Sequence, residues 1–323
     1  MTAYIIRRLL YALPILIGVN ALTFVLFFVV NSPDDMARMH LGSKRVTDEA
    51  IQSWKQDHGY DRPLLVNTAQ QGAAVFTDTI LFEKSIRLFL FDFGQSDSGR
   101  DISHDISQRM WPSLAIAVPT LLIGLAVNIT FALLLAFFRA TYLDFWGVVL
   151  CVAMMSISGL FFIIGGQFLV GKVLNLVPIS GYDTGVNAWK FIVLPMIVGV
   201  VGGIGSGTRW YRTLFLEEVH RDYVRSARAK GVSEHLVLFR HVLRNALIPI
   251  LTGVLVVLPL LFIGSLLTES FFGIPGLGSY TIDAINSQDF AIVRAMVFLG
   301  AVLYILGLLL TDISSLTRGS AIV

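Results

Sequence analysis

The composition of this chain excludes an ordinary soluble domain, because only 14% of its 323 residues are charged and 55% are hydrophobic, against roughly 25% charged residues in soluble domains. The formal net charge of +2 is too small to indicate a nucleic-acid partner, since the basic residues lie between apolar stretches where membrane topology explains them. The single cysteine, Cys151, lies inside an apolar run, which excludes a disulfide framework and a cysteine-ligated metal site.

Residues 1–30 are predicted to be a short N-terminal tail and a first membrane helix. Arg7 and Arg8 precede the apolar run 9–30, an arrangement that also opens a signal peptide. The run is 22 residues long, however, and no small-x-small cleavage motif follows it. A retained helix that can cross a hydrocarbon core about 30 Å thick is therefore expected.

Residues 31–110 are predicted to form a folded segment rather than a linker. Residues 46–58 suit a helix with one apolar face, and Thr47 is in the right place to cap its N-terminus. Gly59 then indicates a helix stop followed by a turn. At the end of the segment, 101–109 suits a short amphipathic helix that leads into the second span.

The remainder, 111–323, is predicted to be a core with five further membrane spans. Their apolar runs are continuous, which favours helices over the short alternating strands of a barrel. The last charge-free run starts only at Ala295, so the sixth span is extended past Arg294 to reach a spanning length. The predicted spans two to six cover residues 111–138, 145–171, 191–208, 245–268 and 291–311.

The placement of Lys and Arg predicts that both termini are cytoplasmic. With this orientation the inner side holds Arg7, Arg8 and the eight basic residues of the loop 209–244, whereas the short outer loops hold few. Residues 31–110 are then extracytoplasmic, and long translocated segments largely escape the rule. The predicted fold class is an all-α membrane protein with six transmembrane helices and an extracytoplasmic segment between the first two.

The loop 209–244, between the fourth and fifth spans, carries eight Lys or Arg, four Asp or Glu and three His. Helix-favouring residues on both sides of Gly231 predict a short helix, a glycine turn and a second helix that runs into the fifth span. Such a loop either docks on a cytoplasmic protein or lays its basic residues on anionic lipid. Composition alone leaves both interpretations open.

No stretch of the sequence predicts catalytic, cofactor or metal chemistry. Residues 166–173 nearly match a phosphate-binding loop, but Val173 replaces the hydroxyl that would bind magnesium and no strand is expected before it. The loop histidines His220, His235 and His241 have no carboxylate or cysteine at ligand spacing. Any dependence on ATP must therefore come from a partner.

Proline and glycine patterns in the spans bear on movement and packing. Pro249 and Pro259 in the fifth span are expected to kink it and to free backbone carbonyls. A transport path that changes conformation needs such kinks, but static membrane proteins have them too. Gly199, Gly203 and Gly207 recur at four-residue spacing in the fourth span. This spacing favours close helix packing, with a hinge or a dimer contact as alternatives.

Several motifs, in this order along the chain, together resemble one transporter family. They are residues 4–10, 59–63, 92–96, 223–231, 240–249, 269–272, 275–278 and 289. The pair 223–231 and 240–249 resembles the cytoplasmic coupling loop of the permease subunits of ABC importers. The ordered set, which covers essentially the whole chain, is most similar to the dipeptide, oligopeptide and nickel permease family.

The resemblance implies a type I importer permease of the bacterial inner membrane that forms half of a path for peptides or peptide-like compounds. It implies as partners a second homologous permease, two cytoplasmic ATPase subunits, an extracytoplasmic solute-binding protein and membrane lipid, but no nucleic acid. The chain is then not itself an enzyme and holds no cofactor, because the partners bind ATP and magnesium. The residues implied for contact with the ATPase are Asp222, Tyr223, Arg225, Ser226, Ala227, Arg228, Ala229, Lys230 and Gly231. Those implied for docking the binding protein are Asp61, Arg62, Pro63, Asp92, Gly94 and Ser96, and those for gating or the path are Pro249, Pro259, Glu269, Gly276 and Gly278.

The chain also departs from the family pattern. Arg225, Ser226 and Ala227 occupy the places of a Glu-Ala-Ala motif, residues 31–34 reduce an expected Pro-Gly-Asp-Pro, and no Asp-Pro-Arg follows Asp312. These departures affect the substrate class more than the fold. The alternatives are a secondary carrier without an ATPase, a membrane-bound enzyme, a scaffold held on lipid, or a permease of the same family for nickel chelates or another non-peptide solute.

Overall fold

The structure is a computed structural model that describes residues 2–42 and 46–319. These residues are helical apart from turns, loops and one isolated bridge between Gln95 and Asp101, so the predicted all-α class is confirmed. The chain divides into two compact units: unit 1 comprises Met1–Met110 with Tyr280–Leu309, and unit 2 comprises Trp111–Ser279 with Leu310–Val323. The helices α6 (Ile102–Phe137), α14 (Leu277–Ser287) and α15 (Phe290–Gly319) run from one unit into the other.

Five helices among the described residues are long and apolar enough to cross a membrane. They are Ile6–Val30, Ile102–Phe137, Ala188–Val219, Glu234–Phe262 and Phe290–Ile313. The remaining predicted span, 145–171, is instead a pair of helices that meet at 90°. The expectation of one uninterrupted helix there is wrong, because the backbone turns extended at Ile157 and Ser158. Counting the bent pair as one span gives the predicted six.

Unit 1 is built around an apolar cluster at one end of its first helix. Its elements before α6 are α1 (Thr2–Phe24), η1 (Val25–Val30), α2 (Pro33–Leu41), α3 (Asp48–Asp57), α4 (Ala74–Thr77), α5 (Ile80–Lys84) and η2 (Ile86–Leu90). The cluster consists of Phe24, Phe28, Met36, Ala37, Ile51, Trp54, Tyr60 and Ile80. Because it joins α1 to α2, α3 and α5, residues 31–110 hold a packed structure rather than a linker.

The helix cap and the turn predicted in residues 31–110 are present, but the separate helix predicted at 101–109 is not. The Thr47 side chain accepts a hydrogen bond from the Ala50 amide at 3.3 Å and caps α3. Gly59 follows the helix with a φ of +67°, which a residue with a Cβ adopts only at a cost. Residues 101–109 do not form a separate helix, since α6 runs from Ile102 straight into the second span.

Unit 2 is organised around one long helix, α9 (Ala188–Val219), which packs against α7, α8, α12 and α13. The other elements of the unit are α7 (Tyr142–Ser156), α8 (Gly159–Gly166), η3 (Gln167–Val173), η4 (Gly185–Asn187), α10 (Asp222–Ala229), α11 (Glu234–Leu236), η5 (Val237–Val242), α12 (Leu243–Val257), η6 (Pro259–Phe262) and α13 (Leu266–Phe272). Here α9 runs past the predicted end of the fourth span at residue 208 and carries the chain into the charged region.

Two of the three spaced glycines of α9 allow close helix packing, as the favoured interpretation predicts. A Cβ on Gly199 would lie 2.8 Å from the Thr120 side chain, and one on Gly207 would lie 2.7 Å from that of Asn128. Gly203 faces open space. The glycine pattern is therefore a packing surface against α6, used at two of its three positions.

Candidate functional site

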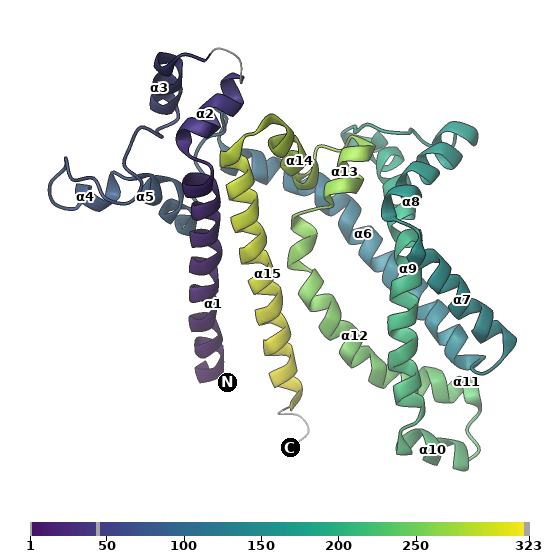
Figure 1. Cartoon of the computed structure of the whole chain (residues 1–323). Helices are drawn as coiled ribbons and strands as arrows, with labels where there is room; N and C mark the ends of the chain where they lie inside the picture. The colour runs from purple at the N-terminus through teal and green to yellow at the C-terminus, as the bar shows by residue number, and fades with distance from the viewer. Residues whose placement is uncertain (1, 43–45, 320–323) are drawn as a thin grey trace. The chain divides into compact units, whose positions relative to one another are not determined.

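The charged loop folds as the predicted helix, turn and helix (Figure 1). Helix α10 follows α9 after a short turn, and α11 leads through the π-helical stretch η5 into α12. Between them Gly231 adopts a φ of +78°. Its amide donates to the Arg228 carbonyl at 2.9 Å, and the amide of Val232 donates to the Ala227 carbonyl at 3.2 Å. These two bonds make a Schellman motif, so the turn is a helix C-cap with a fixed shape rather than a flexible link.

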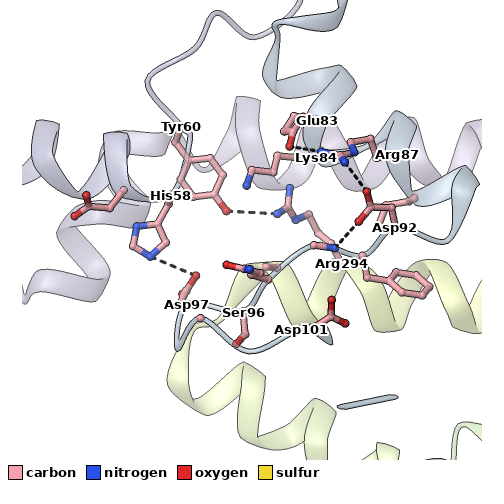
Figure 2. A pocket seen from close by; sticks show the side chains of 17 residues that line it. His58, Tyr60, Glu83, Lys84, Arg87, Asp92, Ser96, Asp97, Asp101 and Arg294 are labelled. Atoms are coloured by element: carbon pink, nitrogen blue, oxygen red, sulfur yellow. Dashed lines mark hydrogen bonds and ion pairs between the residues drawn. The ribbon is translucent and has the colours of Figure 1, made fainter. Parts of the chain in front are cut away.

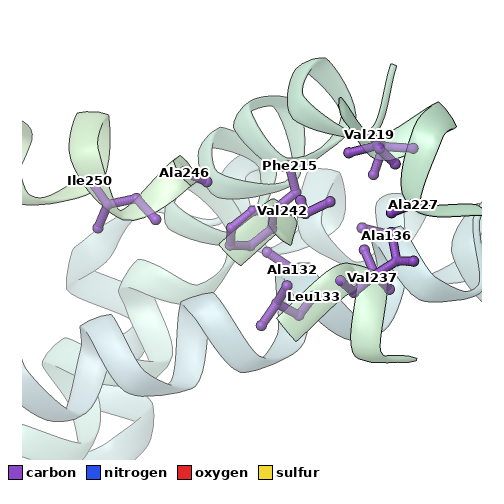
Figure 3. Packing of buried hydrophobic residues seen from close by; sticks show 12 residues of the cluster. Ala132, Leu133, Ala136, Phe215, Val219, Ala227, Val237, Val242, Ala246 and Ile250 are labelled. Atoms are coloured by element: carbon purple, nitrogen blue, oxygen red, sulfur yellow. The ribbon is translucent and has the colours of Figure 1, made fainter. Parts of the chain in front are cut away.

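One face of this helix–turn–helix is held by an apolar cluster (Figure 3). Val224 and Ala227 of α10 are buried against side chains from α6, α9, η5 and α12. The other buried members are Ala132, Leu133, Ala136, Phe215, Val219, Val237, Leu238, Val242, Ala246 and Ile250. Because the cluster draws on three long helices, a displacement of α10 must move their ends or disrupt a packed core.

Ion pairs reinforce the same junction. The Arg228 guanidinium makes two hydrogen bonds to the Glu234 carboxylate, at 3.0 and 2.8 Å, and so fastens α10 to α11. Arg139, beyond the end of α6, donates to the same carboxylate at 2.9 Å. Nearby, Arg212 of α9 makes a two-pronged pair with Asp144 of α7, at 2.8 and 2.7 Å. Such forked pairs fix orientation as well as charge.

The nine residues implied for ATPase contact divide between the two faces of α10. Asp222, Arg225, Ser226, Ala229, Lys230 and Gly231 are exposed. Ala227 is buried in the apolar cluster, Arg228 is half-buried on Glu234, and the Tyr223 hydroxyl donates to Glu218 at 2.5 Å. Burial, followed by this hydrogen bond, raises the pKa of Tyr223 to about 12. The outward face is therefore narrower than the sequence motif and is centred on Arg225, whose side chain is 71% exposed.

Glu269, implied for gating, is the centre of a buried hydrogen-bond knot. It is only 1% exposed, and its Oε2 accepts from the amides of Gly278 and Ser279 at 2.7 and 3.1 Å. Its Oε1 accepts from the Ser265 amide at 3.2 Å, and the Ser113 hydroxyl of α6 also hydrogen-bonds to it. Burial raises the pKa of Glu269, and these donors oppose the rise by stabilising the carboxylate.

The neighbouring glycines make room for this carboxylate. A Cβ on Gly276 or on Gly264 would overlap the carboxylate of Glu269. A Cβ on Gly278 would lie 2.6 Å from the Ser265 backbone. Gly276 and Gly278 thus permit close approach and lock α13 to the first turn of α14, which is the opposite of a loose hinge.

An apolar cavity of about 350 Å³ lies beside the knot. Its lining comes from α6, α9, η6 and α13, with one residue of α12, and includes Glu269 and Ser113. Pro259 is buried at the first position of η6, where the α-helix has already ended at Val257. Pro249 lies inside α12 with its ring exposed. The two prolines of the fifth span therefore differ in role, since only Pro259 marks a break between helical segments.

The residues implied for docking a binding protein lie in unit 1, and half of them surround a polar cavity (Figure 2). Asp92, Gly94 and Ser96 line this cavity of about 580 Å³. Asp92 pairs with Arg87 at 2.7 Å, and Ser96 is buried with its hydroxyl 2.9 Å from that of Ser98.

The other three residues implied for docking do not line the cavity. Arg62 pairs with Asp78 at 3.2 Å, the Pro63 carbonyl accepts from the Ile80 amide at 3.0 Å, and Asp61 is exposed. Turn geometry explains more of these six positions than a shared surface does, because several of them hold the fold of residues 59–96 together.

Sequence reasoning missed three residues of these sites. Ser113 begins the second span and carries no motif, yet it binds Glu269 and also accepts from the Leu277 amide at 2.8 Å. Lys84 and Arg294 line the polar cavity together. The only available signal was Arg294 itself, a charge inside an otherwise apolar stretch. Within the described residues no group of three or more His, Cys, Asp or Glu could hold a metal ion.

Comparison with known proteins agrees with this architecture. The model of the family described as binding-protein-dependent transport system inner membrane component matches residues 128–315, and the model of its N-terminal region matches residues 1–100. A putative peptide transport system permease protein of Brucella suis is 30% identical over 93% of this chain and 92% of its own length. The oligopeptide transport system permease protein AppB of Bacillus subtilis is 27% identical over 97% of this chain and 96% of its own. The glutathione transport system permease protein GsiC of Salmonella typhimurium is 29% identical over 97% and 96%. With a family model over more than half of its length and a curated relative at this identity, the chain belongs to the inner membrane component family of binding-protein-dependent transport systems.

Proposed function

We propose that this chain is a permease subunit of an ATP-driven importer, that it forms half of a path for short peptides, and that α10 receives the movement of a partner ATPase. The observation that supports this most is the construction of the α10 region: a basic outer face on a helix whose inner face is packed into the ends of three long helices. Lipid binding would need basic residues but not this rigid inner packing. The peptide substrate is suggested by relatives named for peptide, oligopeptide and glutathione transport.

The partners in this proposal follow from the family. A solute-binding protein delivers the peptide on the outer side, where residues 31–110 face it, and both termini lie in the cytoplasm. Two ATPase subunits bind and hydrolyse ATP with magnesium, so this chain supplies no catalytic group. A second, homologous permease completes the path. The function is transport, and the energy enters through α10.

The route of the movement can be followed through contacts. The outward residues of α10 (Asp222, Arg225, Ser226 and Ala229) and the turn residues Lys230 and Gly231 meet the ATPase. Closure of the ATPases displaces α10, and the forked pair between Arg228 and Glu234 passes the displacement to α11. The helix from α11 through α12 then moves its far end at Pro259. Coupling requires an element with two arrangements that the partner biases, and this bundle of helix ends is the element proposed.

The hydrogen bonds around Glu269, the Glu269 knot, lie at the other end of this proposed route of movement. It holds α13 and the start of α14 against α6 at Ser113, next to the apolar cavity. In the proposal the knot is a fixed point against which the fifth span bends at Pro259, and the cavity lies along the path. Gly276 and Gly278 serve this role by admitting the carboxylate.

The experiment replaces Arg225 and Lys230 together by glutamate and measures ATPase activity of the assembled transporter with loaded binding protein. Reversing the charge of the outward face should lower the stimulated rate severalfold while the chain still inserts and assembles. The matched control, Arg225→Lys with Lys230→Arg, keeps both positive charges on the outward face and should leave stimulation intact. Unchanged stimulation in the double variant would refute the role of α10.

A further inference from the structure

The polar cavity of unit 1 contains two cations, Lys84 and Arg294, that make no ion pair with a carboxylate of the described residues (Figure 2). Arg294 is only 4% exposed. Its Nε donates to the Phe290 carbonyl at 3.2 Å and its Nη2 donates to the Tyr60 hydroxyl at 3.4 Å. Its Nη1 is buried and finds no hydrogen-bond partner among the described residues. A buried charged donor without a partner is costly and calls for an explanation, and the adjacent polar cavity offers one in a bound ligand.

The second cation is Lys84, at the end of α5. Its ammonium lies 5.2 Å from the centre of the Tyr60 ring, so both cations flank the same tyrosine. It makes no ion pair with a carboxylate of the described residues. Burial, and after it the nearby Arg294, lowers the pKa of Lys84 to about 8, so it remains mostly protonated near pH 7. Two neighbouring positive charges that repel each other form a site for one negative group.

The carboxylates around the cavity do not supply that negative group. Glu83 and Asp92 both pair with Arg87, at 2.6 and 2.7 Å. Asp97 lies 3.7 Å from His58. Glu83 and Asp97 lie near enough for their charges to act on Lys84, and Asp97 also acts on Arg294. None of the three makes an ion pair with either cation, so the cation pair stays open to a ligand from outside.

The remaining lining carboxylates point to the other end of the ligand. Asp57 and Asp101 line the cavity and are exposed, whereas Arg294 is buried. A ligand that enters therefore meets acidic residues at the opening and basic residues inside. This polarity suits a molecule with a carboxylate at its leading end and an ammonium behind it. A phosphate dianion suits it poorly, because five carboxylates line the cavity: Asp57, Glu83, Asp92, Asp97 and Asp101.

We propose that this cavity binds a short peptide through its terminal carboxylate, which Lys84 holds and the positive charge of the buried Arg294 attracts. The volume of about 580 Å³ falls in the range of roughly 300–1,000 Å³ typical of small-molecule sites. That the ligand is a peptide rests on the proposed function. That it carries a carboxylate follows from the two cations of the cavity alone. All lining residues belong to unit 1, and none belongs to α10 or lines the apolar cavity of unit 2, so this site is separate from the cavity placed along the path.

The test measures binding of trialanine to the purified, fully assembled transporter without nucleotide and without binding protein. Wild type should bind trialanine and should bind trialanine amide at least tenfold more weakly, because the amide removes the negative charge. N-acetylation should weaken binding less, since it removes only the contact with the exposed acidic residues.

Variants locate the binding in this cavity. Lys84→Met and Arg294→Met should each lower the affinity for trialanine at least tenfold, and Lys84→Arg should retain it. Arg100→Met, at an exposed cation outside the cavity lining, is the matched control and should bind as wild type does. Lys84 is only half-buried, so its variants keep the test valid if Arg294→Met fails to fold.

Three results would overturn the proposal: no binding of trialanine to wild type, equal binding of the amide, or unchanged binding in Lys84→Met. Loss of binding-protein capture in Lys84→Met without any peptide binding to wild type would assign the cavity to an acidic side chain of that protein instead. None of these results depends on ATP hydrolysis. The Arg225 and Lys230 experiment therefore fails or succeeds independently of this one.

Discussion

At the scale of single residues, the chain places its few buried charges where geometry defines their partners. Glu269 is surrounded by donors, whereas Arg294 retains a free one. Both residues lie at the ends of apolar stretches, where the sequence shows a charge but not its surroundings. Burying a charge costs free energy in both cases. Hydrogen bonds within the protein offset this cost at Glu269, whereas at Arg294 the proposed ligand would offset it.

The replacement Glu269→Gln tests the knot. In the carboxylate, Oε1 and Oε2 both accept hydrogen bonds from backbone amides. Glutamine replaces one of these oxygens by an NH₂ group, which cannot accept a hydrogen bond, so at least one buried donor loses its partner. Each unsatisfied buried donor costs about 1–3 kcal/mol. The midpoint of thermal unfolding in detergent should fall clearly, whereas Glu49→Gln, at an exposed position of α3, should not change it. Equal midpoints for the two variants would mean that the knot adds nothing to stability.

At the scale of elements, the α10 turn shows how a short motif becomes a mechanical part. The positive φ of Gly231 ends α10 and directs the chain into α11, and Val232 joins the apolar cluster beside Ala227. A Cβ on Gly231 would meet no atom within 4 Å, so backbone conformation alone requires glycine there. Local capping chemistry and tertiary packing agree at this point, as expected of a rigid connector.

The prediction at this scale concerns Gly231→Val. A β-branched residue at a φ of +78° is strained by about 1–2 kcal/mol, so the turn should shift and ATPase stimulation by loaded binding protein should drop. Gly231→Asn should largely preserve it, because asparagine tolerates the left-handed region. Gly203→Ala, on an open helical position of α9, serves as the neutral control. If valine and asparagine behave alike, the turn geometry is not what transmits the movement.

At the scale of the whole molecule, the family places the chain in the bacterial inner membrane with several crossings. The two compact units then divide the proposed tasks. Unit 2 contains α10, the Glu269 knot and the apolar cavity, and unit 1 contains residues 31–110 and the polar cavity. Three helices, α6, α14 and α15, connect the units through continuous backbone. The proposed orientation assigns residues 31–110 and α10 to opposite sides of the membrane.

This orientation is testable by labelling of introduced cysteines in a Cys151→Ala background, since Cys151 is the single native thiol. Glu49→Cys on α3 should react with a membrane-impermeant maleimide in spheroplasts. Ser226→Cys on α10 should react only after lysis, and both positions are exposed, so accessibility within the chain does not limit the reaction. Labelling of Ser226→Cys in intact spheroplasts would invert the topology and remove α10 from the reach of a cytoplasmic ATPase.

The sequence by itself determined the membrane class, most span positions, the Thr47 cap and the helix–Gly231–helix order, because apolar run length, capping and positive φ depend on residues close together in the chain. Two features were not predicted from it. One is the 90° break after Ser156, although Ser158-Gly159 is a turn dipeptide within the apolar run, and the other is the inward turn of Ala227 and Arg228 within the α10 motif. Only the tertiary structure decided that Ser113 and Gly278 meet at Glu269, and that Lys84 and Arg294 share Tyr60 without an ion pair to a carboxylate of the described residues. Such sites join residues far apart in the chain, and their energies depend on burial and on which partners remain free, which sequence spacing does not encode.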